Sequence, residues 1–378
     1  MQEEFSAAEV SSPTSPAAST TSSPLARQLA AAYLLLVVYA SLHPFSGWAD
    51  PGVSPLAWVG AAWPRYWTIF DLSANVLGYL PLGFLGVLAL APRMRGAAAV
   101  LATFVACVLL SAVLESLQTY LPSRVASNVD WASNALGALA GALAGAASAA
   151  LLLRRHGLQA LRHRAFRSGS AIDFGLLLLG LWMFALLNPE TLLFGNGDLR
   201  SLFQAADGEH HPAEVFIRFE AAVAAANILA VGQLAAALMR PGQPVRLVLL
   251  LLLLAAFAVR AFAFAMLFSP QDFMLWVTPG ALFGIGAGTL LAMLAVGLPG
   301  AVRLALAGLA LMAATAIVNF APGNPYLQAS LAAWPQGQFL HFNGLTWLVS
   351  VLWPFAALAY VIWLAGGAGR RAAEAGGV

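Results

Sequence analysis

Long apolar stretches recur along the whole of this chain, and they restrict the architectures that it can adopt. Each contains about 17 to 23 residues, enough for one helix to cross a hydrocarbon layer of about 30 Å. Segments such as 247–258 are apolar on every side, whereas the strands of a membrane barrel alternate apolar and polar residues over about 10 positions. We therefore predict an all-α fold, a polytopic transmembrane helical bundle.

The apolar stretches predict about ten transmembrane helices. With 61% hydrophobic and only 9% charged residues, the chain has more apolar surface than one water-soluble core can bury. The helices are expected near residues 26–43, 71–91, 96–118, 130–152, 171–188, 214–239, 247–268, 279–298, 303–320 and 345–365. A leading segment rich in Ser, Thr and Pro has no apolar period, which is typical of a disordered tail.

These segments divide the chain into five regions. They are a disordered N-terminal tail at 1–24, a four-helix transmembrane domain at 25–153, a basic cytoplasmic loop at 154–170, a second four-helix block at 171–300, and two C-terminal helices with a short tail at 301–378. An acidic, polar segment precedes the first apolar stretch, unlike the basic region that begins a signal peptide. We therefore expect the first helix to be retained.

Arginine positions predict the orientation in the membrane. All 18 basic residues are arginines, and with a cytoplasmic N-terminus 13 of them fall on the cytoplasmic side. The 13 are Arg27, Arg93, Arg95, Arg154, Arg155, Arg162, Arg164, Arg167, Arg240, Arg246, Arg303, Arg370 and Arg371. Such a bias is the positive-inside pattern. We expect a multi-pass protein of the bacterial inner (cytoplasmic) membrane with both termini in the cytoplasm, because abundant Ala, Gly and Arg without lysine is typical of GC-rich bacteria.

Several site classes find no support in the sequence. Cys107 is the only cysteine, which excludes an internal disulfide and a cysteine-based metal cluster. No metal site and no cofactor is predicted. The one basic run is the membrane-proximal loop, so nucleic acid is not an expected partner. Membrane lipids are the expected partners, together with a lipid-linked envelope substrate or a glycopeptide.

Rare polar residues gather near the predicted outer ends of the first four helices. The candidate substrate-binding residues are His43, Asp71, Asn75, Glu115, Gln118, Arg124, Asp130 and Asn134. They include pairs spaced three or four residues apart, so that each pair lies on one helix face. A charge in hydrocarbon costs about 2.5–3.5 kcal/mol on insertion scales, so these faces are expected to converge inside the bundle.

Structural explanations compete with a binding role for these residues. Asp71 and Asp130 each begin a helix, where a carboxylate caps free backbone N–H groups. Glu115 lies about one turn inside an otherwise apolar helix, which favours an interior role, and Arg124 is the expected counter-ion.

Three ordered motifs in this region resemble the VanZ-like family. They are Asp71-Leu-Ser-Ala-Asn-Val-Leu-Gly-Tyr-Leu-Pro-Leu-Gly83, Glu115-Ser-Leu-Gln-Thr-Tyr-Leu-Pro-Ser-Arg124 and Asp130-Trp-Ala-Ser-Asn-Ala-Leu-Gly137. His43-Pro44 also fits, and the resemblance covers about residues 26–152. It implies a role in the cell envelope, since VanZ is associated with low-level teicoplanin resistance. It supplies no reaction mechanism.

The second block echoes the first and predicts a faded duplication. Leu187-Asn188-Pro189 follows the pattern of Leu42-His43-Pro44, and Ala226-Asn227-Ile228-Leu229 that of Ala74-Asn75-Val76-Leu77. The position most like Glu115 falls near Arg260. Arg260 requires a partner inside the membrane, for which Asp272, Glu220 and the Glu214 region are candidates, unless its side chain snorkels toward an interface.

Three function classes stay open at this stage. The first is binding or modification of an amphiphilic envelope substrate at the outer leaflet, with a link to glycopeptide resistance. The second is an intramembrane acid–base enzyme, because His43 and the carboxylates are suitable side chains. The third is a transporter, suggested by the repeat, although no ionisable relay crosses to the cytoplasmic side.

Overall fold

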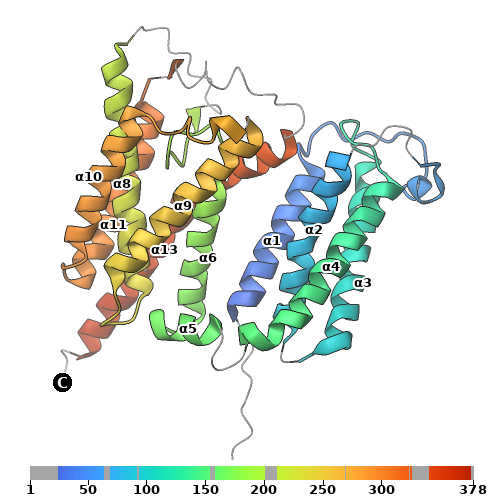
Figure 1. Cartoon of the computed structure of the whole chain (residues 1–378), viewed down its shortest axis with the longest axis horizontal. Coiled ribbons are helices and arrows are strands. Elements are labelled where there is room, and N and C mark those ends of the chain that lie inside the picture. The colour runs from blue at the N-terminus through green and yellow to red at the C-terminus, as the bar shows by residue number, and fades with distance from the viewer. Residues whose placement is uncertain are drawn as a thin grey trace, which may run out of the picture.

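The fold is an all-helical bundle in two groups of helices (Figure 1). The computed structural model describes residues 24–63, 69–91, 93–153, 158–200, 211–268, 270–322, 324–325 and 340–375. Within these ranges the regular structure is helical, apart from one isolated bridge between Phe166 and Met239. The predicted disordered tail lies outside the described residues, except for its last position.

Four helices form the first block: α1 (Pro24–Leu42), α2 (Ile69–Leu90), α3 (Gly96–Gln118) and α4 (Asn128–Leu153). The second block contains α6 (Ser170–Ala185), α8 (Ala213–Leu238), α9 (Val245–Leu267), α10 (Pro279–Ala295), α11 (Gly300–Phe320) and α13 (Leu340–Ala375). Short helices lie between them: η1 (Ala57–Gly60), α5 (Leu158–Ala165) and η2 (Pro270–Asp272). In Figure 1, α5 lies at the lower end, between the two blocks.

Each predicted transmembrane segment coincides with one of these helices, but the number of spans is not settled at ten. Among the described residues, seven helices are long and apolar enough to cross a membrane: α1, α2, α3, α8, α9, α11 and α13. The apolar helices α6 and α10 are shorter, and α4 begins with a polar turn. The prediction of 171–188 was too long, because α6 ends at Ala185 and a turn follows. The chain is a multi-pass membrane protein.

Large apolar side chains on the outside of the bundle agree with a lipid environment. On α3, Leu101, Leu109 and Val113 are 63%, 60% and 56% exposed. Residues four apart lie on one face of a helix, so these positions form a continuous apolar stripe. A water-soluble surface rarely carries such a stripe, whereas acyl chains cover it at no cost.

Glycines bring α2 and α4 into close contact. A side chain at Gly137 or Gly141 would collide with the backbone of α2 at Val76 and Leu80, and one at Gly83 would collide with Ala138 of α4. Small residues at a membrane helix interface let the two backbones approach closely. The α2–α4 pair thereby fixes the relative position of the polar residues in the first turns of the two helices.

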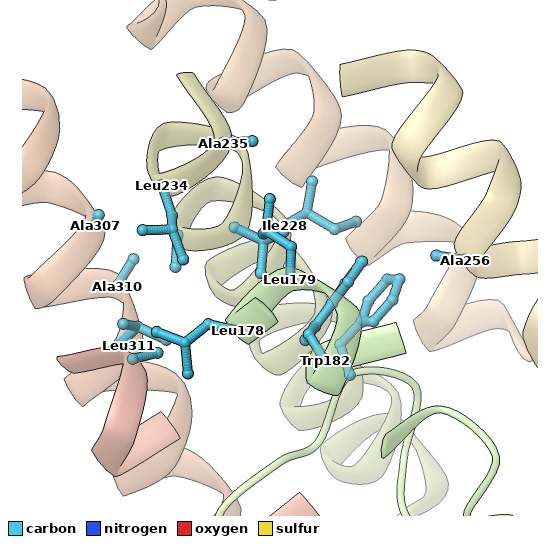
Figure 2. Packing of buried hydrophobic residues seen from close by; sticks show 14 of the residues in the cluster. Leu178, Leu179, Trp182, Ile228, Leu234, Ala235, Ala256, Ala307, Ala310 and Leu311 are labelled. Carbon is cyan, nitrogen blue, oxygen red and sulfur yellow. The ribbon is translucent and has the colours of Figure 1, made fainter. Parts of the chain in front are cut away.

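The second block repeats this arrangement between α8 and α10. Gly284 lies against Ala221, Gly288 against Ala225, and Gly232 of α8 faces Ala292. Figure 2 shows Leu178 and Trp182 of α6 among side chains of the neighbouring helices. The Trp182 indole N–H donates to the Asn227 side-chain oxygen at 3.0 Å. Both blocks thus use their second and fourth helices as a close pair, which agrees with a duplication; the duplication itself stays a prediction.

Helix α1 joins the two blocks at both of its ends. Near its start, the Gln28 amide donates to the Ser170 carbonyl at 3.2 Å, and near its end the Tyr39 hydroxyl donates to the Gly344 carbonyl at 3.3 Å. At the lower side, Arg162 of α5 forms an ion pair with the buried Asp173 of α6. The basic segment is therefore packed against the second block.

Candidate functional site

A column of polar side chains runs into the first block from the end where α2 and α4 begin, between α2, α3 and α4. Asn75 hydrogen-bonds the Asp130 carboxylate, which links α2 to α4. One turn deeper, the Asn134 amide donates to the Ser111 hydroxyl at 3.0 Å, which links α4 to α3. The three predicted helix faces therefore meet. We call Asp71, Asn75, Ser111, Glu115, Asp130 and Asn134 the polar column.

Glu115 is buried in this column, with 4% of its surface exposed. Its carboxylate accepts a hydrogen bond of 2.8 Å from the backbone N–H of Ser127. The Ser127 hydroxyl in turn accepts from the backbone of Val129 and Asp130, so it caps α4. A carboxylate at this place also suits the positive end of the helix dipole. Glu115 thus couples α3 to the start of α4.

Arg124 and Gln118 close the C-terminal end of α1. The Arg124 guanidinium donates to the Ala40 carbonyl, and the Gln118 amide donates to the Ser41 carbonyl at 2.8 Å. The last carbonyls of a helix have no partner within it and carry partial negative charge, so a cation stabilises them. Among the described residues Arg124 has no carboxylate within ion-pair distance, but its charge still acts on Glu115 and Asp130. Arg124, which the sequence predicted to be the counter-ion of a carboxylate, therefore serves first as a cap of α1.

His43 lies where the first block meets α13. A side-chain carbon on Gly344 would approach the His43 imidazole to 2.9 Å, and the Tyr39 ring lies 5.4 Å from it. Burial, and after it the positive charge of Arg124, lower the pKa of His43 below its ordinary value of 6.5. His43 is accordingly neutral at pH 7.

Arg124→Gln is expected to raise the pKa of His43 toward 6.5, because it removes the second cause of the shift. Nuclear magnetic resonance of histidine-labelled protein measures this pKa, with His43→Gln identifying the signal. The pKa of His43 is lower in the folded state than in the unfolded state, so the unfolded state binds the imidazole proton more readily. The stability that neutral His43 contributes is therefore lost as the pH falls below 6.5. An unchanged pKa in the variant would show that Arg124 does not act on His43.

The second block places an arginine at the matching helix end. Arg260 of α9 is 2% exposed and donates to the carbonyls of Leu186, Asn188 and Thr191, which follow α6. Of the partners considered from the sequence, Glu220 is the one whose charge acts on Arg260. Glu220 also hydrogen-bonds the side chain of Thr278, the cap of α10. Both blocks thus combine an arginine at the end of their first helix with a carboxylate at the start of their fourth.

Outside the polar column, the described residues offer few groups that could bind a metal ion or a ligand. Within the described ranges no three His, Cys, Asp or Glu side chains are grouped so as to hold a metal ion. A cavity of about 490 Å³ lies at the opposite end of α1 from His43, where Gln28, Phe174, Tyr360 and Trp363 line it. Its lining is mainly apolar and belongs to both blocks, so it is separate from the polar column.

Sequence reasoning missed three contributors to the site. Ser111 and Ser127 complete the hydrogen bonds of Asn134 and Glu115, and Gly344 covers His43. Ser111 lies one turn from the predicted residue Glu115, and Ser127 lies just before α4. These positions could have been used to predict both serines from the sequence. Gly344 is 301 positions from His43 and carries no such signal.

Comparison with known proteins gives a match for the first block. Residues 10–149 match the family model VanZ/LLP1, a range that contains the polar column, His43 and Arg124. No curated protein and no solved structure matches the chain. The second block lies beyond the matched residues.

Proposed function

We propose that this chain, whose residues 10–149 are VanZ-like, binds an amphiphilic substrate of the bacterial cell envelope at the outer end of its first block. The observation that supports this most directly is the polar column. Asp71 is exposed at its mouth, Asn75 and Asp130 are half-buried below, Glu115 is buried beside the start of α4, and Asn134 is buried at the base. Polar groups inside a membrane bundle are costly to keep, and they commonly mark a substrate path.

The arginines support placement in the cytoplasmic membrane with both termini in the cytoplasm. Arg93, Arg95 and Arg240 lie in the short connections α2–α3 and α8–α9, and Arg246 lies in the first turn of α9, at the end of the bundle that also carries α5. Short cytoplasmic loops are enriched in arginine. The polar column then opens on the outer leaflet, where lipid-linked envelope intermediates and glycopeptides are found.

We link this binding to glycopeptide resistance of the teicoplanin type, and Glu115→Gln tests the link. The amide oxygen of glutamine can still accept the Ser127 N–H, so the fold is expected to be retained while the charge is lost. In a sensitive bacterial host, resistance conferred by the native chain should fall to that of cells without it. Arg124→Ala should have the same effect.

The matched control is Asp50→Asn, in the exposed loop after α1. This variant also removes an acidic charge on the outer side, but its partner is the nearby backbone of Gly52. It should keep full resistance at equal membrane abundance. If Glu115→Gln and Arg124→Ala were both as resistant as this control, the polar column would not be the functional site.

A second candidate is acid–base catalysis on a lipid-linked substrate. It is favoured by the burial of Glu115 next to the charge of Asp130, because two interacting carboxylates can hold one proton between them. Purified protein incubated with envelope lipids would then release a product, and Glu115→Gln would release none. Binding of lipid without turnover would retain the binding function and reject the enzyme.

A further inference from the structure

From the charges of the polar column we infer the substrate class: an amphiphile whose head group carries a protonated amine, held between Asp71 and Asp130. This inference rests on the proposed binding function. The two carboxylates start α2 and α4, the pair whose backbones are in contact through Gly137 and Gly141. They lie close enough for the charge of Asp71 to act on Asp130. An ammonium between them would relieve this repulsion.

The balance of charge disfavours an anionic head group. Asp71, Glu115 and Asp130 supply three carboxylates. Arg124 supplies one guanidinium, and that group already donates to the Ala40 carbonyl at the end of α1. A phosphate or carboxylate placed at the mouth of the column would meet like charges without a dedicated cation. A cation would meet charge-assisted acceptors, which form the stronger kind of hydrogen bond.

An unsatisfied acceptor at the base of the column is independent evidence for a donor ligand. Asn134 is 6% exposed, and its side-chain oxygen has no hydrogen-bond partner among the described residues, although its amide nitrogen donates to Ser111. A buried acceptor without a partner costs about 1–3 kcal/mol. Asn134 lies one turn below Asp130 on the same helix face, the face of α4 that carries the column. A ligand N–H, directly or through water, would satisfy it.

The surroundings of the mouth suit an amphiphile. Asp71 and Ala74 are exposed on α2, and one turn deeper Leu77 is 64% exposed. On α4, Leu136 is 58% exposed. A head group at Asp71 can therefore stay at the outer surface while its acyl chains extend along the apolar sides of α2 and α4.

Binding of three phospholipids to the purified full-length protein tests this inference. The probes carry ethanolamine, choline or glycerol head groups on identical acyl chains, and their affinities are measured by competition against one fluorescent ethanolamine lipid in detergent micelles. Ethanolamine should bind about tenfold more tightly than glycerol, the ratio expected for one charge-assisted hydrogen bond. Choline should be weaker than ethanolamine, because its quaternary nitrogen has no N–H to donate.

Two variants and one control locate the preference. Asp71→Asn, which keeps an oxygen acceptor at an exposed position, and Asp130→Asn should each reduce ethanolamine binding to the level of glycerol. Asp50→Asn should leave it unchanged. Equal affinities for ethanolamine and glycerol, choline binding equal to ethanolamine, or an intact preference in both variants would overturn the amine assignment. Loss of resistance in Glu115→Gln would still support the proposed function in that event, so the two failures are distinguishable.

Discussion

Arg260→Ala is expected to lower the free energy of unfolding by about 3–5 kcal/mol, the cost of removing one partner from a buried charged network. The guanidinium is inaccessible to solvent and donates to three carbonyls that follow α6, at 3.0 Å for Leu186 and 2.5 Å for Thr191. Alanine would leave these carbonyls without donors and Glu220 without the nearby positive charge. The segment after α6 should lose its fixed position.

Denaturant titration in mixed micelles measures this loss, with Arg246→Ala as the control. Arg246 lies on the same helix but is exposed, with one long hydrogen bond of 3.4 Å to Met293. Its removal should cost less than about 1 kcal/mol. Equal stability of the two variants would show that the contacts of Arg260 do not support the second block.

Gly141→Leu is expected to force α2 and α4 apart, at a cost of about 1–3 kcal/mol or more. The new side chain would begin inside contact distance of the Leu80 carbonyl, which belongs to the backbone of α2 and cannot move aside alone. The displacement would also separate Asp71 from Asp130. We therefore expect reduced stability in denaturant titration together with weaker ligand binding at the outer end.

Gly78→Ala provides the opposite case on the same helix pair. Nothing lies within 4 Å of a side-chain carbon placed at Gly78 of α2, so alanine fits without strain. Replacing an unconstrained helical glycine should stabilise the protein by about 0.5–1 kcal/mol. If Gly141→Leu were tolerated as well as Gly78→Ala, the close approach of α2 and α4 would not be required.

The helices and the convergence of polar faces were predictable because both depend on local spacing. Apolar length predicts a membrane helix, and pairs such as Asp71 with Asn75 lie on one helix face in any context. The partners of these residues depend on packing between distant segments. Arg124 was expected to pair with a carboxylate, but the end of α1 brings an unpaired carbonyl within its reach. Helix dipoles and free carbonyls are not visible in a residue pattern.

The attachment of α1 limits how the two blocks can move. Transporters built from two halves expose a central site alternately by rocking one half against the other. Here such rocking would have to break the Gln28–Ser170 bond at one end of α1, the Tyr39–Gly344 bond at the other, or both. A rotation that separates the blocks at the end that carries α5 must also pull Gly344 from the face of the His43 imidazole or pivot on that contact. These contacts therefore restrain rocking of one block against the other, and an occupant of the polar column would enter and leave at the end of the bundle where α2 and α4 begin.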